Sequence, residues 1–445
     1  MIENILKNYF DIECDTRMQP HIQIWRDWYK GENAFHKYSV YNGQTMVGCN
    51  RDSLRMPKRI AEDWANLLMN EKVDINTDNE ETNKRLKAAF TANDFYVRAN
   101  ALVEQTFALG TGAMVEYADA LGNPVIDFVT ADKIYPISWD GTNVTECAFA
   151  SRKYIHGKAF YYLNIHLIGN DGYVIHNRMY SADDCREAAL PKGTERTVET
   201  HSFNRRYQIL RPNIVDNIEE NTPMGISVIA NAISEVKGVD LVYDSLINEF
   251  KLGKKRIFVP ETMVQHQQAK DGVINPIFDT NDTVFYSLPG STESEQKPIE
   301  SNMSLRTAEH ISALQTTLEL LASKCGLGSD RYIYKNGGVK TATEVVSDKS
   351  ELYQNLKKHE IVFRSALISL TTALAEIMGI GEVTTKVDFD DSIIEDKDAE
   401  FKRDMQLVSI GAMKNYEVRS KCLNEPLDTA KAQCAEAQID NIFEE

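Results

Sequence analysis

The fold is decided by residues 326–379, GLGSDRYIYKNGGVKTATEVVSDKSELYQNLKKHEIVFRSALISLTTALAEIMG. A glycine-rich, cationic loop leads here into a long helical pattern that starts at Thr341 and ends before Gly379 and Gly381. Thr341 and Glu344 have the spacing of a capping box, in which each side chain accepts a hydrogen bond from an unpaired backbone N–H at the helix start. Apolar residues then recur at steps of three, four or seven, which predicts one helix face: Val345, Leu352, Leu356, Phe363, Leu367, Leu370, Leu374 and Ile377.

This predicted helix is about 57 Å long at the usual rise of roughly 1.5 Å per residue. Such a length exceeds what a small globular core can use, so the helix is expected to span between layers of an assembly. The loop before it carries Arg331, Lys335, Asn336 and Lys340 among glycines that permit several backbone conformations. The capped helix would hold this cationic loop at a defined place.

Composition restricts the class of protein. The 445 residues are 42% hydrophobic and 26% charged, which is typical of an ordered chain with two or three domains. No run of eighteen apolar residues predicts a membrane span, and the first ten residues lack the apolar centre of a secretion signal. The net charge of −17 argues against a generic high-affinity nucleic-acid binder, although it allows local cationic contacts to DNA.

The sequence predicts no enzyme, cofactor or metal. Seven cysteines are dispersed without a CxxC pair, which favours reduced thiols and argues against zinc. The stretch Gly338-Val339-Lys340-Thr341 differs from a nucleotide-binding loop, because a valine separates glycine from lysine and the upstream glycine is missing. Asp388, Asp390 and Asp391 form an acidic cluster that is a candidate Mg²⁺ site for nuclease chemistry. Because consecutive residues of a strand point to opposite faces, a solvated acidic surface is the favoured interpretation.

The first part of the chain is expected to be an α+β domain of about 220 residues. Helical spacing marks its beginning, for example at Ile60, Trp64 and Leu68. From Ala113 the period changes, and turn residues separate five runs that favour one antiparallel meander. These runs are Met114–Tyr117, Val125–Val129, Cys147–Tyr154, Tyr161–Leu167 and Tyr173–Tyr180.

A helix is then predicted from Ile226 to Phe250, with Asp240 in its apolar stripe. A buried carboxylate must be paired or hydrogen-bonded, so we expect Asp240 to meet a cation or donor at or near a helix interface. The helix ends in a cationic cluster, which either complements the helix dipole or, repeated around a ring, contacts a phosphate backbone. Its members are Lys251, Lys254, Lys255 and Arg256.

A second helix is expected to return from Ser304 to Cys325, with Ile311, Leu314, Leu318 and Leu321 in its stripe. The two helices would bracket residues 257–302, a partly β excursion with four prolines and a polar tip from Ser291 to Lys297. An exposed, rigid knob of this kind suits binding to a partner.

This order of elements resembles the portal proteins of tailed bacteriophages, of the long-tailed siphophage kind. The resemblance covers nearly the whole chain. It rests on stretches that are weak singly and specific in their order: Trp25–Gly31, Gly110–Val115, Pro223–Gly225, Glu249–Val259 and Lys340–Ser347.

The resemblance implies a portal fold within the α+β class, with two stem helices around a small α/β clip and a long kinked helix after a tunnel loop. It divides the chain into a wing (1–222), a first stem helix (223–256), a clip (257–303), a second stem helix (304–325), a tunnel loop (326–340), the long helix (341–381), and a wing return with a short crown (382–445).

The resemblance also implies a structural role without catalysis. About twelve copies would form a ring at one capsid vertex, through which double-stranded DNA is packaged and later ejected. The implied partners are the terminase large subunit, the head–tail adaptor, the major capsid protein and the scaffolding protein. The ring would assemble in the host cytoplasm and remain in the virion.

Particular residues receive roles from the resemblance. Arg331, Lys335, Asn336 and Lys340 would line the channel and touch DNA phosphates, and Asp240 would lie near a contact between stem helices of neighbouring subunits. Two alternatives stay open: another structural virion protein, such as a connector or minor capsid protein, and a Mg²⁺-dependent phage nuclease.

Overall fold

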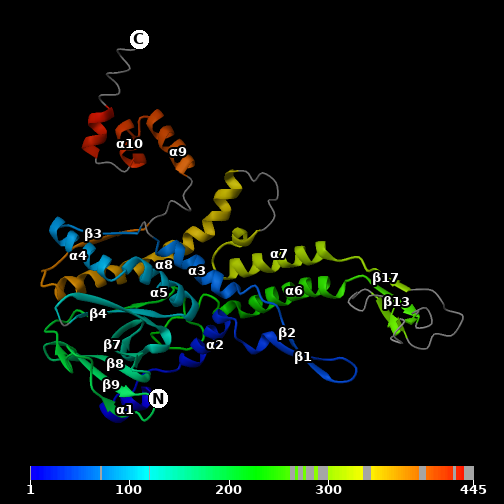
Figure 1. Cartoon of the computed structure of the whole chain (residues 1–445). Helices are drawn as coiled ribbons and strands as arrows, with labels where there is room; N and C mark the ends of the chain where they lie inside the picture. The colour runs from blue at the N-terminus through cyan, green and yellow to red at the C-terminus, as the bar shows by residue number, and fades with distance from the viewer. Residues whose placement is uncertain are drawn as a thin grey trace.

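The computed structural model describes residues 2–70, 73–119, 121–260, 266–268, 274–276, 285–288, 299–333, 342–389, 397–423 and 427–434. These residues form a mixed helix-and-sheet body from which two long helices project side by side toward a few short strands (Figure 1). The projecting helices and their strands lie at the opposite end of the molecule from the large sheet.

Helices dominate the N-terminal part of the body. The spacing of Ile60, Trp64 and Leu68 predicts one amphipathic helix there, and all three side chains are buried. That helix packs closely against the one that ends at Leu109. The helices are α1 (Ile2–Phe10), α2 (Gln19–Lys30), α3 (Met56–Leu68), α4 (Glu80–Ala92) and α5 (Phe95–Leu109).

Two antiparallel sheets follow. One has the order β12-β4-β5, and the other has the order β10-β9-β8-β7-β6 with β11 also paired to β9. Their strands are β4 (Gly112–Ala118), β5 (Pro124–Thr130), β6 (Ile134–Asp140), β7 (Asn143–Ile155), β8 (Lys158–Gly169), β9 (Gly172–Ser181), β10 (Glu187–Ala188), β11 (Thr197–Glu199) and β12 (Tyr207–Leu210).

The five predicted strand positions are confirmed, but the single meander is wrong. After β5 the 3₁₀ turn η2 (Ala131–Lys133) redirects the chain, so that β6 starts a separate sheet. The free edge of β4 is instead filled by β12, where Tyr207 pairs with Val115. This pairing joins residues about ninety positions apart, which local turn signals do not reveal.

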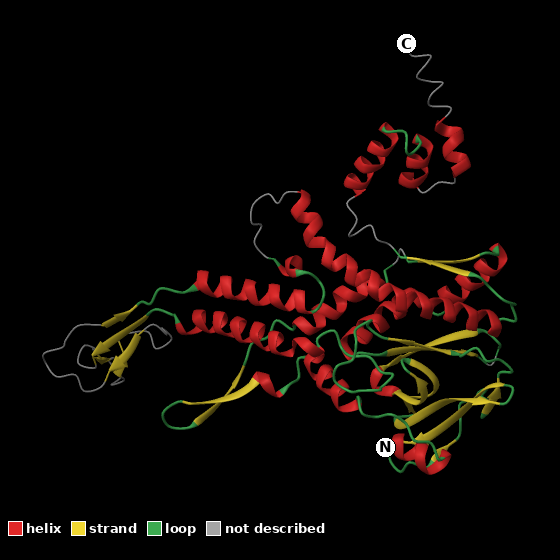
Figure 2. Ribbon diagram, turned by 180° about the vertical axis from the view of Figure 1, so that it is seen from behind, coloured by secondary structure: helices red, strands yellow, loops and turns green. Residues whose placement is uncertain are grey.

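The projecting pair consists of α6 (Ile233–Leu252) and α7 (Thr307–Lys324), which pack along each other (Figure 2). The expected start of the first helix at Ile226 is wrong. The amide of Val228 and the hydroxyl of Ser227 both donate to the carbonyl of Phe107, so this stretch is bound to α5. Ile226 and Ile229 are buried in the body, and a 3₁₀ turn, η3 (Ala230–Ala232), precedes α6.

Short strands connect the far ends of α6 and α7. β13 (Arg256–Pro260) pairs parallel with β16 (Phe285–Leu288) and antiparallel with β17 (Ile299–Ser301), while β14 (His266–Gln268) pairs with β15 (Ile274–Pro276). The predicted β character of this excursion is therefore confirmed where it is described. The polar tip, Ser291–Lys297, lies outside the described residues.

The long predicted helix is confirmed as α8 (Ala342–Ile377). Gly379, at φ +65°, ends it, and the amide of Ile380 donates to the carbonyl of Ala375. Thr341, the predicted N-cap, and the side chain of Glu344 lie outside the described residues. α8 packs against β12, β4 and α3, and so crosses the body from the loop end to the sheets.

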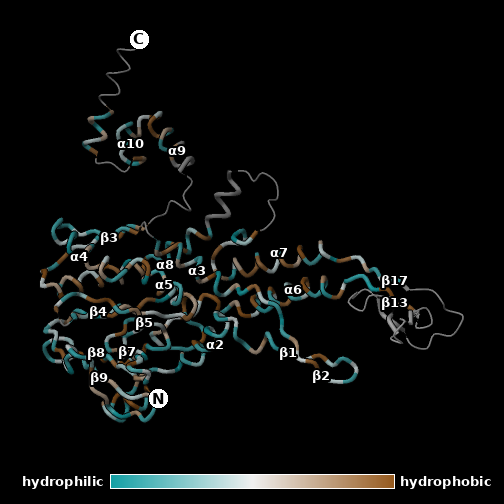
Figure 3. The backbone as a smooth tube through the Cα atoms, in the orientation of Figure 1, coloured by the Kyte–Doolittle hydropathy of each residue, from teal (hydrophilic) through white to brown (hydrophobic). Residues whose placement is uncertain are grey.

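Three smaller units complete the chain. β18 (Thr385–Asp388) follows α8 and pairs with β3 (Asp74–Thr77). A hairpin of β1 (Lys37–Tyr41) and β2 (Met46–Asn50) projects beside α6, with hydrophobic residues on its strands (Figure 3). Near the C-terminus lie α9 (Lys397–Ser409) and α10 (Asn415–Leu423), which contact each other.

Candidate functional site

Asp240 is buried in α6, with 1% of its surface exposed. It accepts hydrogen bonds from Nε2 of His36 at 2.8 Å, the hydroxyl of Ser53 at 2.9 Å and the amide of Leu54 at 3.0 Å. The prediction that it meets a donor is therefore confirmed. These donors belong to the same chain, in the segment around the β1–β2 hairpin. A contact with a neighbouring subunit stays a prediction.

The cationic cluster at the end of α6 is partly paired. Lys251 forms an ion pair of 2.8 Å with Asp52, whose amide donates to the buried Asp244 one turn beyond Asp240. Lys255 forms an ion pair with Glu300 in β17. Two of the lysines predicted to contact phosphates therefore form ion pairs with carboxylates of their own chain.

The other two members of the cluster lie close by. Lys254 is exposed between α6 and β13, and Arg256 begins β13 opposite Ser301.

Glu249 ties the far end of α6 to the start of α7. Its carboxylate accepts from Arg306 at the backbone amide (3.1 Å), Nε (3.2 Å) and Nη2 (2.9 Å), and it lies 3.6 Å from His310. The hydrogen bonds from the Arg306 side chain lower the pKa of Glu249 to about 2. The predictions from sequence do not include this pair. Its signals were an acidic residue near the end of one helix and an arginine just before the next helix.

The loop after α7 begins on a fixed base. In the 3₁₀ turn η5 (Ser329–Tyr332), Nη2 of Arg331 binds the buried carboxylate of Asp63 in α3 at 2.9 Å. The Tyr332 hydroxyl donates to the same carboxylate at 2.8 Å, and Arg59 lies 3.3 Å from it. Arg331, which was predicted as a loop cation that touches DNA, therefore forms an ion pair with a carboxylate of its own chain.

Aromatic packing fixes the end of α7 as well. The Trp64 indole Nε1 donates to the carbonyl of Cys325 at 3.2 Å, and its ring stacks on Phe107. His359, from α8, meets both rings edge-on with centroids 4.7 and 5.0 Å away. Burial lowers the pKa of His359 to about 3, so it is neutral at pH 7.

Gly326 is the first residue of the loop and contacts α8 directly. Its carbonyl accepts from Nδ2 of Asn355 at 3.1 Å, and its φ is +77°. A Cβ at this position would lie 3.2 Å from Asn355 Nδ2. The predicted DNA contacts Lys335, Asn336 and Lys340 follow this base and lie outside the described residues.

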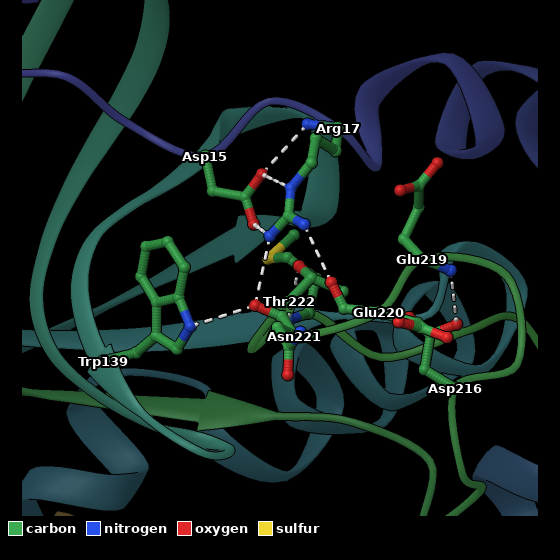
Figure 4. Close-up of polar contacts among 9 residues, drawn as sticks. Asp15, Arg17, Trp139, Asp216, Glu219, Glu220, Asn221 and Thr222 are labelled. Atoms are coloured by element: carbon green, nitrogen blue, oxygen red, sulfur yellow. Dashed lines mark hydrogen bonds and ion pairs between the residues drawn. The ribbon is translucent and has the colours of Figure 1, made fainter.

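Arg17 holds the chain just before it enters the projecting helices (Figure 4). Its guanidinium donates to the carbonyls of Glu220 (2.8 Å) and Asn221 (3.1 Å), and the Trp139 indole also donates to Asn221. Asp15 accepts from Nε and Nη2 of Arg17. Burial raises the pKa of Asp15, but hydrogen bonds from Arg17 and Thr222 together outweigh it and hold that pKa below its usual value.

Among the described residues, no three His, Cys, Asp or Glu side chains are grouped closely enough to hold a metal ion. Asp388 forms an ion pair of 2.9 Å with Lys386, and Asp390 lies outside the described part of the chain. No helix within that part is long and apolar enough to cross a membrane.

No curated protein matches this chain by sequence. Among solved structures it is similar to a chain in the "Neck of native GTA particle computed with C12 symmetry", with 13% identity, a TM-score of 0.44, and coverage of 91% of this chain and 93% of that one. A chain in the "Neck of empty GTA particle computed with C6 symmetry" has the same identity and coverage and a TM-score of 0.41.

The family comparison is more direct. Residues 9–442 match the model described as "Phage portal protein, SPP1 Gp6-like", which leaves only a few residues at each end unmatched. Because the match extends over nearly the whole sequence, the chain belongs to the SPP1 Gp6-like family of phage portal proteins.

Proposed function

We propose that this chain forms a ring of about twelve copies at one vertex of a phage capsid, whose central channel conducts double-stranded DNA during packaging and ejection. The observation that carries this proposal is the family match over residues 9–442. The ring is a structural part of the virion, and the packaging motor supplies the chemical energy.

The elements of the fold suit the parts of such a ring. The body up to residue 222 serves as the wing, α6 and α7 as the stem, and the strands between them as the clip. Residues 326–340 form the tunnel loop, α8 is the long helix that follows it, and residues 382–445 supply the wing return and a short crown. This assignment is supported by the projection of α6 and α7 from the body (Figure 1).

Within the tunnel loop we assign DNA contact to Lys335, Asn336 and Lys340 and give Arg331 a different role. Arg331 and Tyr332 hold the first turn of the loop on Asp63 of α3. The remaining cations follow this fixed base along the chain, and we assign them to the channel. Contacts of exposed lysines to phosphates are screened by salt and independent of sequence, so they suit DNA that must slide.

The clip docks the terminase large subunit during packaging and the head–tail adaptor afterwards, while the wing faces the major capsid and scaffolding proteins. The cations at the end of α6 act near this docking region. Lys251 and Lys255 already have the carboxylates of Asp52 and Glu300 as partners, so Lys254 is the exposed member of the cluster best able to meet another molecule.

Negative-stain imaging of the purified protein tests the ring. Rings with a central hole are the expected result, and a monomer at every concentration would overturn the proposal. A photoreactive residue at position 336 tests the channel in filled particles. Adducts with DNA are expected, whereas adducts with protein alone would exclude a channel-lining loop.

Two sets of variants separate the roles of the loop and the clip. Lys335→Gln with Lys340→Gln should lower DNA retention while rings persist, and Arg331→Gln should instead lower thermal stability. Replacing Ser291–Lys297 with a short Gly-Ser linker should leave rings intact and weaken docking of terminase or adaptor. Collapse of the rings would assign that segment to the ring contact.

A further inference from the structure

The β1–β2 hairpin exposes an apolar surface that nothing in its own chain covers over the described residues. Val40 pairs with Val47 on one face, and Tyr41 pairs with Met46 on the other. Between 42% and 65% of each of these side chains is exposed. Lys37 is the one charged residue between positions 37 and 50, in a chain that is 26% charged. A two-stranded hairpin in water is marginally stable by itself, so this surface calls for a partner.

The root of the hairpin is firmly held. Asp240 binds His36 before β1 and both Ser53 and Leu54 after β2, and Asp244 binds the amide of Asp52. Both ends of the hairpin are therefore fixed on α6 by buried carboxylates. The hairpin is presented at a defined angle to the stem, as a surface made for docking would be.

A second uncharged surface lies on α7. On the side of α7 that carries Leu320, the exposed side chains between residues 312 and 323 are small or uncharged: Ser312, Ala313, Thr316, Leu320 and Ser323. Leu320 is 60% exposed on this face. Ile311, which the helical stripe of the sequence predicts to be buried, is 40% exposed but lies on the opposite side of the helix. Glu319, the one charged residue in this stretch, is half-buried and accepts a hydrogen bond from Gln315.

We propose that the β1–β2 hairpin of each subunit packs on this face of α7 in the neighbouring copy of the chain. The inference rests on the proposed ring and names one of its contacts. In both views of the molecule α6 lies between the hairpin and α7 (Figures 1 and 2). Because the two complementary surfaces lie on different sides of one subunit, they give a head-to-tail contact between subunits. Such contacts close into a ring when the rotation from one subunit to the next divides a full turn evenly.

The two surfaces also match in size and character. Each five-residue strand spans about 17 Å, and the uncharged face of α7, from Ser312 to Ser323, extends for roughly 17 Å along the helix. Neither surface requires a charged group to lose its water on contact, apart from Lys37 at the root. Ala313 and Thr316 are small enough to let a strand approach the helix closely.

Crosslinking within intact rings tests the contact directly. Rings assembled from isotopically heavy and light full-length subunits would carry benzoylphenylalanine at position 47, on the hairpin face that Val40 and Val47 share. We expect mixed heavy–light adducts on residues 312–323. Rings whose adducts fall on other elements, or stay within one subunit, would overturn this inference and leave the ring itself standing. Absence of rings from the unmodified chain would overturn the proposed function as well.

Variants supply an independent test. Val40→Asp with Val47→Asp should raise the protein concentration needed for ring assembly at least tenfold while circular dichroism stays unchanged. Leu121→Asp, on an 86% exposed side chain in the β4–β5 turn, is the matched control and should assemble as the parent does. Combining Val47→Lys with Leu320→Glu should recover assembly lost in Val47→Lys alone. Unchanged assembly of the double aspartate variant would contradict the contact. If that variant does not fold, the crosslinking experiment alone tests the contact.

Discussion

Gly110 and Gly225 touch backbone to backbone. A Cβ on Gly110 would lie 2.4 Å from the carbonyl oxygen of Gly225, and a Cβ on Gly225 would lie 2.5 Å from that of Gly110. The amide of Gly225 also donates to the hydroxyl of Thr111 at 3.0 Å. The turn that ends α5 and the segment that leads into α6 therefore meet at a distance that only glycine allows.

Gly110→Ala should lower the free energy of unfolding by more than about 3 kcal/mol, because the methyl group collides with backbone and φ is +88°. Thermal unfolding of the variant measures the loss. Gly238→Ala is the matched control, since a Cβ there meets nothing within 4 Å inside α6. It should be neutral or stabilising by up to about 1 kcal/mol. Equal effects of the two substitutions would refute the close approach.

Asp63→Asn should destabilise the base of the tunnel loop, because a neutral amide cannot compensate the charge of Arg331 or accept equally from Tyr332. We expect a loss of roughly 2–3 kcal/mol, below that of a fully buried pair since 29% of the Arg331 side chain is exposed. Hydrogen exchange of residues 326–333 should rise in parallel. Arg59→Ala, which removes an exposed partner of the same carboxylate, should cost less than about 1 kcal/mol.

Acid should destabilise the protein through two buried histidines. Burial lowers the pKa of both His166 and His359 from 6.5 to about 3. The native state keeps them neutral while the unfolded chain binds protons, so stability falls as pH drops from about 6.5 toward 3. Each histidine contributes a loss of roughly 2 kcal/mol by pH 5.

The variant His359→Asn tests this pH dependence. Its amide oxygen can accept from the backbone amide of Asn213, as His359 Nδ1 does at 2.9 Å. Urea unfolding at pH 7 and pH 5 should show a smaller difference for the variant than for the parent. His201→Asn is the control, because His201 is exposed and Asp171 raises its pKa. A control that flattens the profile as much as His359→Asn would count against buried histidines as the cause.

Asp240→Leu should destabilise the protein by about 3 kcal/mol, because it leaves the donors of His36, Ser53 and Leu54 without an acceptor in a buried place. Asp240→Asn retains acceptor oxygen and should fall between the parent and the leucine variant. Ser245→Leu, at an exposed position of the same helix, is the control. Unchanged thermal stability of Asp240→Leu would show that the three hydrogen bonds contribute little.

Helical periodicity predicted the elements whose burial depends on their own sequence. Leu356, Phe363 and Leu370 recur on one face because α8 has one buried side, and the structure confirms all three as buried. Local turn residues similarly predicted the positions of β7, β8 and β9. In each case the deciding interactions lie within a few residues of each other along the chain.

Contacts between distant segments could not be predicted in the same way. Ile226 and Ile229 have helical spacing, yet the backbone between them is bound to Phe107, over a hundred residues earlier. Asp63 has the sequence context of a surface residue on an amphipathic helix, and its burial depends on Arg331. A single sequence specifies that Asp240 needs a donor but does not identify which distant segment supplies it.

The pairing of β13 with β17 has a wider consequence. Arg256 and Ser301 are neighbours in this ladder, so the chain leaves and re-enters the stem at the same place. Just inside this point, Glu249 and Arg306 close the helices on each other. In topology, residues 257–300 are therefore an insertion into the α6–α7 hairpin, whose two helix ends these contacts hold together. Related chains could exchange it for a different insertion, and thereby change docking partner, while α6, α7 and the body keep their sequence.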